Sequence, residues 1–313
     1  MRIKLIATDM DGTLLDSEKK MPDDFFEWVN EHDKVKFVIA SGRQYYALKR
    51  DFVPIHDKLI YIAENGAIIF HHDEIIYYES LNDNLIQIKQ TFFDNALKAD
   101  QLARSGEADF KVCYLTFDDG PYLLTDTILD ILEEKDVLAT FFARKRLDED
   151  YIPIYLRERV NGHTIGNHTA SHKISKGIYR SNEIFINDII ENRQFIFDML
   201  GVTTDVMRFP GGSYEATYMG LSKSKLVNEL NDIGYGYVDW THATGDGGAT
   251  LSPYEYLHNV IDYTDDDRAI VVLMHDYSKN TAECLPEMID ELSKQGYIFL
   301  PLWHDSPAVK KGA

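Results

Sequence analysis

The sequence predicts an α/β protein in which a partial Rossmann-like α/β segment precedes an irregular (β/α)7 barrel. Apolar runs of strand length alternate with helical patterns through most of the chain, which is typical of parallel β/α units. Seven of these runs follow a soft, polar stretch at residues 103–108, which has the composition of a linker. At 313 residues the chain can build two hydrophobic cores. We therefore expect one unit at residues 1–102 and another at 103–313.

The first unit is predicted to contain three strands, their connecting helices, a hairpin and one further helix. The strands are expected at residues 3–8, 35–40 and 59–63, the helices at 25–32, 45–52 and 84–97, and the hairpin strands at 67–70 and 75–78. His71-His72-Asp73-Glu74 has metal-binding residue types, but it lies at the tip of the hairpin. A solvated turn is the favoured interpretation of that tetrapeptide.

The second unit is predicted to contain seven strands separated by helices. The strands are expected at residues 112–117, 139–142, 164–167, 206–209, 237–240, 270–274 and 298–300. The clearest helical pattern places Leu285, Met288, Ile289 and Leu292 on one face. Seven successive β/α units predict an incomplete or irregular barrel.

Composition limits the classes of partner and the location. The formal charge of −20 argues against nucleic acid and anionic membranes, and it favours a substrate that is neutral or engaged through a cation. No apolar run approaches the roughly 20 residues that span a bilayer. The N-terminus lacks the apolar stretch of about 7–15 residues of a secretory signal, so a cytoplasmic chain is expected. Cys113 and Cys284 are expected to be buried free thiols.

Polar residues follow three of the predicted strands of the second unit. Asp118-Asp119-Gly120-Pro121 follows the first, Pro210-Gly211-Gly212 follows a strand that contains Arg208, and His275-Asp276 ends a third. In α/β barrels the chemistry gathers at the C-terminal ends of the strands. We therefore expect these residues to share one site.

His168 and His172 lie four residues apart between these segments, on a helical turn or a tight loop, so that both rings can face one point. Two histidines and a carboxylate around an open position form a catalytic divalent-metal site. Taken singly, a His-x-x-x-His is usually a surface accident and an Asp-Asp-Gly-Pro is usually a turn. Their joint occurrence at the ends of strands in one unit favours the site.

Five ordered motifs carry a resemblance to the polysaccharide deacetylase family, carbohydrate esterase family 4, over about residues 110–304. The motifs are Thr116-Phe117-Asp118-Asp119-Gly120-Pro121, Ala139-Thr140-Phe141-Phe142, residues 162–172, Arg208-Phe209-Pro210-Gly211-Gly212-Ser213 and Leu273-Met274-His275-Asp276. The family has a (β/α)7 barrel and removes acetyl groups from N-acetylated, or O-acetylated, poly- and oligosaccharides. The resemblance therefore implies a metal-dependent hydrolase with an acetylated carbohydrate as its substrate.

The resemblance also implies roles for single residues. The implied metal ligands are Asp119, His168 and His172, with zinc as the first expectation and cobalt or nickel as alternatives. The implied general base is Asp118, paired with Arg208, and the implied general acid is His275, oriented by Asp246. The implied oxyanion and substrate contacts are Gly211, Pro210 and Trp240.

A further motif of the family departs from its usual form here. The family commonly has a Trp, an acid three residues later and then Asp-Trp, whereas this chain has Trp240, Ala243 and Asp246-Gly247. The missing second Trp removes one apolar wall of the site. His163 lies outside the ligand spacing and is expected to be structural.

Three short motifs follow the predicted strands of the first 100 residues: Asp9-Met10-Asp11-Gly12-Thr13, Ser41-Gly42-Arg43 and Glu64-Asn65-Gly66-Ala67. They resemble the haloacid dehalogenase superfamily, specifically its sugar phosphatases. The resemblance implies Asp9 as nucleophile, Asp11 as acid/base and Ser41 as a phosphate contact, with magnesium as the cofactor. The family's later lysine and its terminal acidic motif are missing, so the site is interpreted as vestigial. Gly245-Asp246-Gly247-Gly248 imitates the acidic motif but lies inside the deacetylase pattern.

Two alternatives to a deacetylase remain at this point. One is a magnesium-dependent sugar phosphatase whose site is completed by another chain. The other is a non-catalytic carbohydrate-binding module, although such a module needs neither Asp118 nor His275. A homodimer stays open, as does the identity of the sugar.

Overall fold

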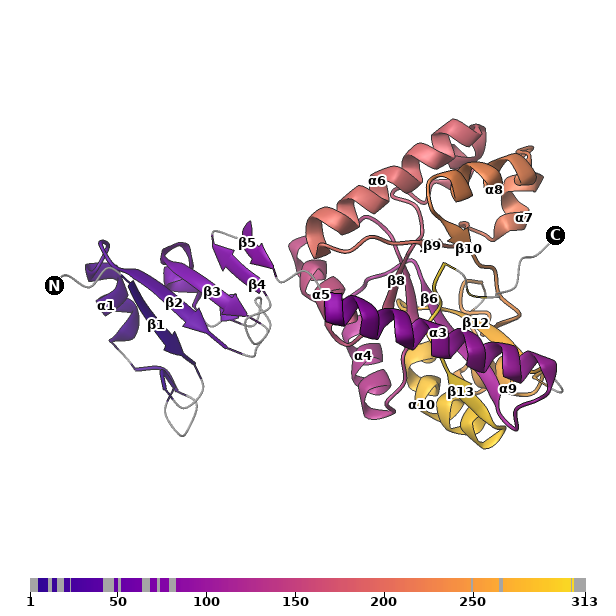
Figure 1. The fold of residues 1–313 in the computed structure, drawn as a ribbon, viewed down its shortest axis with the longest axis horizontal. Helices are drawn as coiled ribbons and strands as arrows, with labels where there is room; N and C mark the ends of the chain where they lie inside the picture. Colours follow the sequence, from indigo (N-terminus) through magenta and orange to yellow (C-terminus); the bar gives the residue numbers. More distant parts are fainter. Residues whose placement is uncertain are drawn as a thin grey trace. The chain divides into compact units, whose positions relative to one another are not determined.

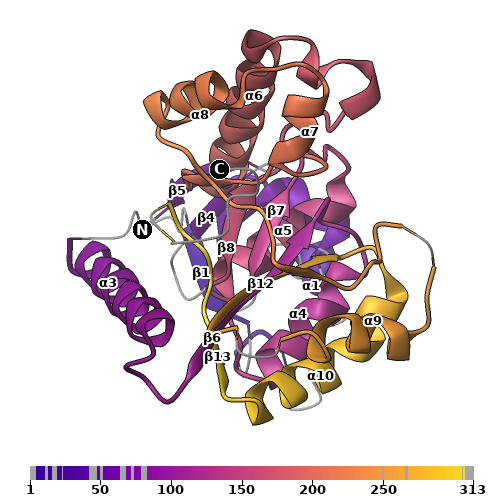
Figure 2. The ribbon, with the colours of Figure 1, turned by 90° about the vertical axis from the view of Figure 1, so that its right-hand side faces the viewer.

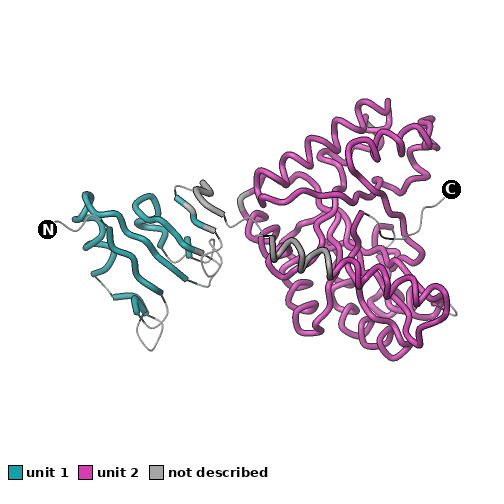
Figure 3. The backbone as a smooth tube through the Cα atoms, viewed as in Figure 1, with its two compact units in different colours: residues 1–88 teal, residues 89–313 magenta. Residues whose placement is uncertain are grey.

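The computed structural model contains two compact units (Figures 1 and 3). It describes residues 5–10, 13–15, 20–22, 24–41, 48–49, 52–63, 68–71, 74–78, 83–248, 250–264, 267–304 and 306. Unit 1 comprises Met1–Ile88 and unit 2 comprises Lys89–Ala313. The boundary therefore comes earlier in the chain than the sequence predicted.

Unit 1 is built on a five-stranded sheet of order β1-β2-β3-β4-β5. Its strands are β1 (Leu5–Asp9), β2 (Lys36–Ala40), β3 (Leu59–Ala63), β4 (Ile68–His71) and β5 (Glu74–Tyr78). The first three are parallel, and β4 and β5 add an antiparallel hairpin, as predicted. Helix α1 (Phe25–Glu31) and the 3-10 helix η1 (Val53–Lys58) connect the parallel strands. Of the helix predicted at 45–52, only residues 48–49 are described as helical.

The core of unit 1 lies on the middle strand of the parallel part. The central residues of β2 are buried, and Phe37 and Ile39 pack with Val29 of α1 and with Phe52 and Tyr61. Within the described sheet, β1 pairs with β2 alone, and alternate residues of β1 are exposed, including Leu5.

Helix α3 (Asp83–Ser105) explains the shift of the boundary, because it extends into the predicted linker at residues 103–108. Ala96 and Ala103 are buried in a cluster of unit 2. Asp100 is fully buried and accepts hydrogen bonds from the Tyr114 hydroxyl at 2.7 Å and from Arg104 Nε at 2.6 Å. The polar composition at 103–108 therefore marks the end of a packed helix rather than a linker.

Unit 2 is built on a parallel sheet. Its strands are β6 (Lys111–Asp118), β7 (Thr140–Ala143), β8 (Thr164–Asn167), β9 (Val206–Met207), β10 (Gly236–Tyr237), β11 (His242–Ala243), β12 (Ala269–His275) and β13 (Tyr297–Phe299). Seven of them follow the order β10-β9-β8-β7-β6-β12-β11, and β13 pairs with the first residues of β6. Each of the seven predicted strands is present. Strand β11 was not predicted, because its two residues are too short to give a pattern.

Helices surround this sheet (Figure 2). They are α4 (Thr125–Glu134), α5 (Ile152–Val160), α6 (Asn182–Leu200), α7 (Ser213–Tyr218), α8 (Lys223–Asp232), α9 (Pro253–Ile261) and α10 (Lys279–Lys294), with 3-10 helices at Glu149–Tyr151, Ile174–Lys176 and Ile178–Arg180. The α10 face of Leu285, Met288, Ile289 and Leu292 is buried, as predicted. It packs with α4, α9, β6 and β12 in one core cluster. Cys113 and Cys284 are both buried free thiols.

Candidate active site

Two adjacent aspartates end the central strand of unit 2. Asp118 is the last residue of β6, is 3% exposed, and lies in register with Phe142 of β7 and His275 of β12. Asp119 has a φ of 77°, in the left-handed region that non-glycine residues seldom adopt. A Cβ atom at Gly120 would lie 1.9 Å from Asp276 Oδ2, so this turn requires glycine. Strained backbone of this kind is typical of functional sites.

His168 and His172 lie on a tight loop after β8 rather than on a helical turn. Thr169 and His172 have φ values of 66° and 52°. The side chain of Asn167 holds this loop: its Oδ1 accepts from the Thr169 N–H at 2.9 Å and from Asn192 Nδ2 at 3.0 Å. Since Asn167 and Asn192 are fully buried, the loop is fixed from inside the unit.

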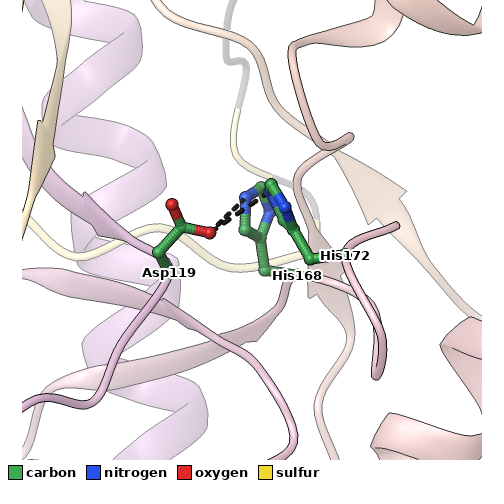
Figure 4. A group of neighbouring side chains, drawn as sticks. All are labelled: Asp119, His168 and His172. Carbon is green, nitrogen blue, oxygen red and sulfur yellow. Dashed lines mark ion pairs between the residues drawn. The ribbon is translucent and has the colours of Figure 1, made fainter. Parts of the chain in front are cut away.

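The three predicted ligands, Asp119, His168 and His172, lie together and form a group that could hold a metal ion (Figure 4). Their ligand atoms all lie within 4.8 Å of one another. Asp119 Oδ1 is 3.2 Å from His172 Nε2 and 3.9 Å from His168 Nε2. In the described part of the chain, no other cluster of three such ligands is found.

The protonation of these ligands suits a cation. Burial, assisted by the nearby His168, lowers the pKa of His172 to about 4, so its ring is neutral at neutral pH. His168 donates from Nδ1 to the Arg208 carbonyl oxygen at 2.9 Å, which leaves Nε2 with a free lone pair. Burial opposes ionisation of Asp119, but the surrounding histidines and Arg144 outweigh it and lower its pKa. Two imidazoles and one carboxylate are the donor set of a catalytic zinc site.

Arg208 holds Asp118 in place. Arg208 is fully buried, and its Nη1 donates to Asp118 Oδ1 at 2.8 Å and to Thr116 Oγ1 at 2.7 Å. Its Nε and Nη2 donate to the carbonyl oxygens of Val238 and Asp239. A buried charge pair needs this completeness, because each unsatisfied group would cost free energy. The predicted pairing of Asp118 with Arg208 is present in the structure.

Asp246 follows β11, the strand that pairs with β12, and contacts His275 at the end of β12. Asp246 Oδ1 is 2.8 Å from His275 Nδ1, and Asp246 Oδ2 accepts from the His275 backbone N–H at 2.8 Å and from Thr281 Oγ1 at 2.6 Å. Burial alone would lower the pKa of His275, but the hydrogen bond from its ring to Asp246 and the charges of Asp118 and Asp119 raise it. His275 Nε2 lies 4.0 Å from Asp119 Oδ2.

The loop after β9 lies beside Trp240. Gly211 and Gly212 both have positive φ, of 76° and 87°, and a Cβ atom at Gly212 would lie 3.0 Å from Trp240 Cη2. The Pro210 carbonyl oxygen accepts from the Tyr179 hydroxyl at 2.8 Å. Among the described residues, the N–H of the exposed residue Gly211 makes no hydrogen bond. His163, expected to be structural, is buried and accepts from the Ala139 N–H through Nδ1.

Two aromatic rings near His275 were not predicted. A Cβ atom at Gly247 would lie 2.7 Å from His275 Cε1, so a larger residue there would displace the His275 ring. The ring of Tyr277 lies 5.1 Å from that of His275, and the ring of Tyr122 lies 5.4 Å from that of Tyr277. The only available signal was that each follows a motif by one residue. Tyr277, which is 40% exposed, therefore supplies an aromatic surface beside His275.

In unit 1, Asp9 is the last residue of β1, and Ser41 comes directly after β2, the strand that pairs with β1. Asp9 ends β1 in register with Ala40, and the Ser41 N–H donates to the Ile62 carbonyl oxygen. Asp11, Gly42, Arg43 and residues 64–67 lie outside the described residues, as do His72 and Asp73 of the hairpin tip. Within the described chain, no helix is both long and apolar enough to cross a membrane.

Comparison with known proteins gives two family matches. The polysaccharide deacetylase model matches residues 105–235, and the sucrose-6F-phosphate phosphohydrolase model matches residues 2–155. Residues 105–155 therefore belong to both matches.

Individual proteins resemble the second unit. The chain is 33% identical over 194 residues to YheN of Bacillus subtilis, covering 60% of this chain and 66% of that protein, which is just under two thirds of its length. It is 30% identical over 198 residues to a peptidoglycan-N-acetylglucosamine deacetylase of Bacillus cereus, covering 61% and 85%. The crystal structure of the catalytic domain of peptidoglycan N-acetylglucosamine deacetylase from Eubacterium rectale matches with a TM-score of 0.60 and 34% identity, covering 64% and 92%.

Proposed function

The chain belongs to the polysaccharide deacetylase family, and we propose that unit 2 hydrolyses the acetamide of an N-acetylated sugar within a poly- or oligosaccharide. One observation carries this proposal: a three-ligand metal group, a buried Asp118–Arg208 pair and an Asp246–His275 pair meet at one edge of the sheet. A metal group alone would fit many hydrolases. A base and an acid beside it fit hydrolysis of an amide.

We propose Asp119, His168 and His172 as the ligands of one zinc ion, with cobalt or nickel able to replace it. When bound, a divalent metal supplies a Lewis acid for the acetyl carbonyl and lowers the pKa of a coordinated water from 15.7 to about 7. The lowered pKa of Asp119 and the neutral ring of His172 mean that these two ligands need not lose a proton before the metal binds.

Asp118 is proposed as the general base that accepts a proton from the attacking water. Its Oδ1 is bound by Arg208, which leaves Oδ2 facing the metal ligands, 3.7 Å from His168 Nε2. The fixed arginine partner holds the carboxyl group of Asp118 in one orientation. The exposed Gly211 N–H is proposed as a donor to the oxyanion, which is usually the largest catalytic contribution.

His275 is proposed as the general acid. An amide nitrogen cannot leave as an anion, so a proton must reach it as the C–N bond breaks. The raised pKa of His275 keeps its ring protonated to a higher pH, and Asp246 on Nδ1 directs Nε2 toward the metal ligands. The products are acetate and a free amino sugar.

Acetate release from N-acetylglucosamine oligomers tests this proposal. The full chain should release acetate, a chelator should abolish the release, and zinc should restore it. O-acetylated xylan serves as the parallel substrate that reports preference for N- over O-acetyl groups. A zinc-loaded, folded chain that releases acetate from none of these compounds would contradict the proposal.

A further inference from the structure

Three consecutive basic residues follow β7 next to the metal ligands, and they have different surroundings. Arg144 Nη1 lies 3.5 Å from Asp119 Oδ1, and the backbone N–H of Arg144 donates to the Gly120 carbonyl oxygen. Lys145 forms an ion pair with Glu191 at 2.9 Å. The guanidinium of Arg146 lies over the ring of Tyr122 at 4.0 Å and over that of Tyr151 at 5.0 Å.

The two arginines leave much of their hydrogen-bonding capacity unused. Among the described residues, the Nε atoms of Arg144 and Arg146 have no acceptor, and Arg146 has no carboxylate within ion-pair distance. By contrast, Arg157 on the outside of unit 2 contacts Asp126, Asp130 and Glu133. With 52 acidic and 32 basic residues, the chain has enough carboxylates to pair every arginine. Arg146 nevertheless has no carboxylate of the described chain within ion-pair distance, and its guanidinium lies on two tyrosine rings near the metal ligands.

Aromatic rings connect Arg146 to the proposed acid. Tyr122 lies under Arg146, Tyr277 lies 5.4 Å from Tyr122, and His275 lies 5.1 Å from Tyr277. These residues follow β6, β7 and β12, which are adjacent in the sheet. Tyr277 is 40% exposed and Arg144 is partly exposed, so a substrate can reach the surface that these arginines and tyrosines form, which we call the rim. The rim thus combines aromatic faces with two planar cations.

We propose that Arg144 and Arg146 form a subsite for a carboxylate carried by the substrate, so that the preferred substrate is an acidic N-acetylated sugar. The inference rests on the proposed deacetylase function and specifies its substrate class. Planar guanidinium groups bind carboxylates through paired hydrogen bonds. Because the chain carries a net charge of −20, long-range attraction cannot recruit an anion, and recognition must come from these local donors.

The test uses a matched pair of substrates, an N-acetylated amino-sugar oligomer whose acetylated sugar bears a carboxylic acid, and its methyl ester. Acetate release by the zinc-loaded full chain gives kcat/KM for each. We expect the acid to be preferred by about tenfold or more, which is the contribution of a charged hydrogen bond. Arg146→Gln should lower the acid-to-ester ratio by about the same factor.

Lys145→Gln is the matched control, since it removes the same charge from a neighbouring residue that is already paired, and its ratio should equal that of the wild type. Arg146→Lys keeps the charge without the planar fork and should keep part of the preference. Arg144→Gln provides a second variant should Arg146→Gln fold poorly. A wild-type ratio near one, or a ratio unchanged by both arginine variants, would overturn the subsite. Failure to release acetate from either the acid or the ester would instead contradict the deacetylase proposal.

Discussion

Strands β1 and β6 present a comparison between the two units. Both are parallel strands that end in aspartate, at Asp9 and Asp118, and both carry a family motif. Strand β6 is buried along almost its whole length and pairs with β12, β7 and β13. Strand β1 has β2 as its one partner in the described sheet, and alternate residues of β1 are exposed.

The difference shows what a motif needs in order to become a site. Because β6 has neighbours on both sides, the ends of β8, β9 and β12 bring histidines and an arginine to Asp118 and Asp119. An edge strand receives such help from one side only, and an open edge is also a liability for aggregation. Intact motif residues are therefore weaker evidence of activity than neighbouring strands that supply partners.

Substitution of Asp119 should reduce acetate release far more than substitution of Asp9. Asp119→Ala should lose bound metal and acetate release together, since the metal contributes several kcal/mol to the transition state, or on the order of 10³-fold in rate. Asp9→Asn in unit 1 is the control and should leave acetate release unchanged. Metal content by mass spectrometry and acetate assays measure both. A metal-free Asp119→Ala chain with normal turnover would remove the metal from the mechanism.

A second substitution distinguishes the metal ligand from the base. Asp118→Asn should keep the metal and lower kcat by about 10²–10⁴, the range for loss of a general base. The isosteric amide can still accept from Arg208, so folding should be little affected. Near-normal turnover by this variant on its best substrate would show that another group takes the proton.

The pH profile tests the Asp246–His275 pair. Because the pKa of His275 is raised above the usual 6.5, its protonated form persists to higher pH, and kcat/KM should fall only as pH rises through that raised pKa. Asp246→Asn removes the carboxylate that raises it, so the alkaline limb should move to lower pH. Activity at neutral pH should fall by about 10- to 100-fold, as for other supporting residues.

A surface pair provides the control for that profile. His258 and Asp262 form a hydrogen-bonded pair of the same chemistry on α9, partly exposed to solvent. Asp262→Asn should leave the profile unchanged. A limb that stays in place in Asp246→Asn would show that His275 is not the group being titrated.

The parts of the fold that could be predicted from sequence are those with continuous patterns. Strand β6 was predicted within a residue at each end, because a strand buried on both faces gives an unbroken apolar run. The buried face of α10 was predicted from its helical spacing. Helix α3 was predicted too short, because its second half packs through small residues, such as Ala96 and Ala103, that give little apolar signal.

The candidate site divides in the same way. Its ligand residues were identifiable because they occur in ordered motifs, but the left-handed backbone at Asp119, Thr169 and His172 could not be predicted, since these residue types rarely adopt it. The roles of Arg146 and Tyr277 depend on contacts between loops that follow different strands. Such contacts leave no periodicity in the sequence.

Removal of α3 should lower the stability of unit 2 by a smaller amount. A chain of residues 89–313 should keep full activity, whereas one of residues 106–313 should be less stable. The shorter chain loses Asp100 and leaves the buried Tyr114 hydroxyl without its acceptor, which alone costs about 1–3 kcal/mol. It also uncovers the surface under Ala96 and Ala103. Equal denaturation midpoints for the two chains would show that α3 does not stabilise unit 2.

We predict that unit 1 does not hydrolyse phosphate esters, despite its resemblance to phosphatases. The phosphohydrolase match extends to residue 155, but the structure places most of α3 and all of β6, α4 and β7 in unit 2, and β6 pairs with β12, β7 and β13. The segment that should extend the phosphatase sheet therefore builds the deacetylase. Magnesium also requires six oxygen ligands, and phosphoryl transfer requires positive charge on the phosphoryl oxygens, which the missing lysine of the family would supply.

The measurement is phosphate release from p-nitrophenyl phosphate and a set of sugar phosphates, with magnesium, by the full chain and by Asp9→Asn. Both chains should give the same background phosphate release. Without cationic groups to stabilise the phosphoryl oxygens, Asp9 supports no turnover that its substitution could remove. Asp118→Asn, measured in parallel, identifies any release that arises in unit 2. Phosphate release that survives in Asp118→Asn and disappears in Asp9→Asn would make the chain bifunctional. It would also show that an edge strand such as β1 can support catalysis without partner strands on both sides.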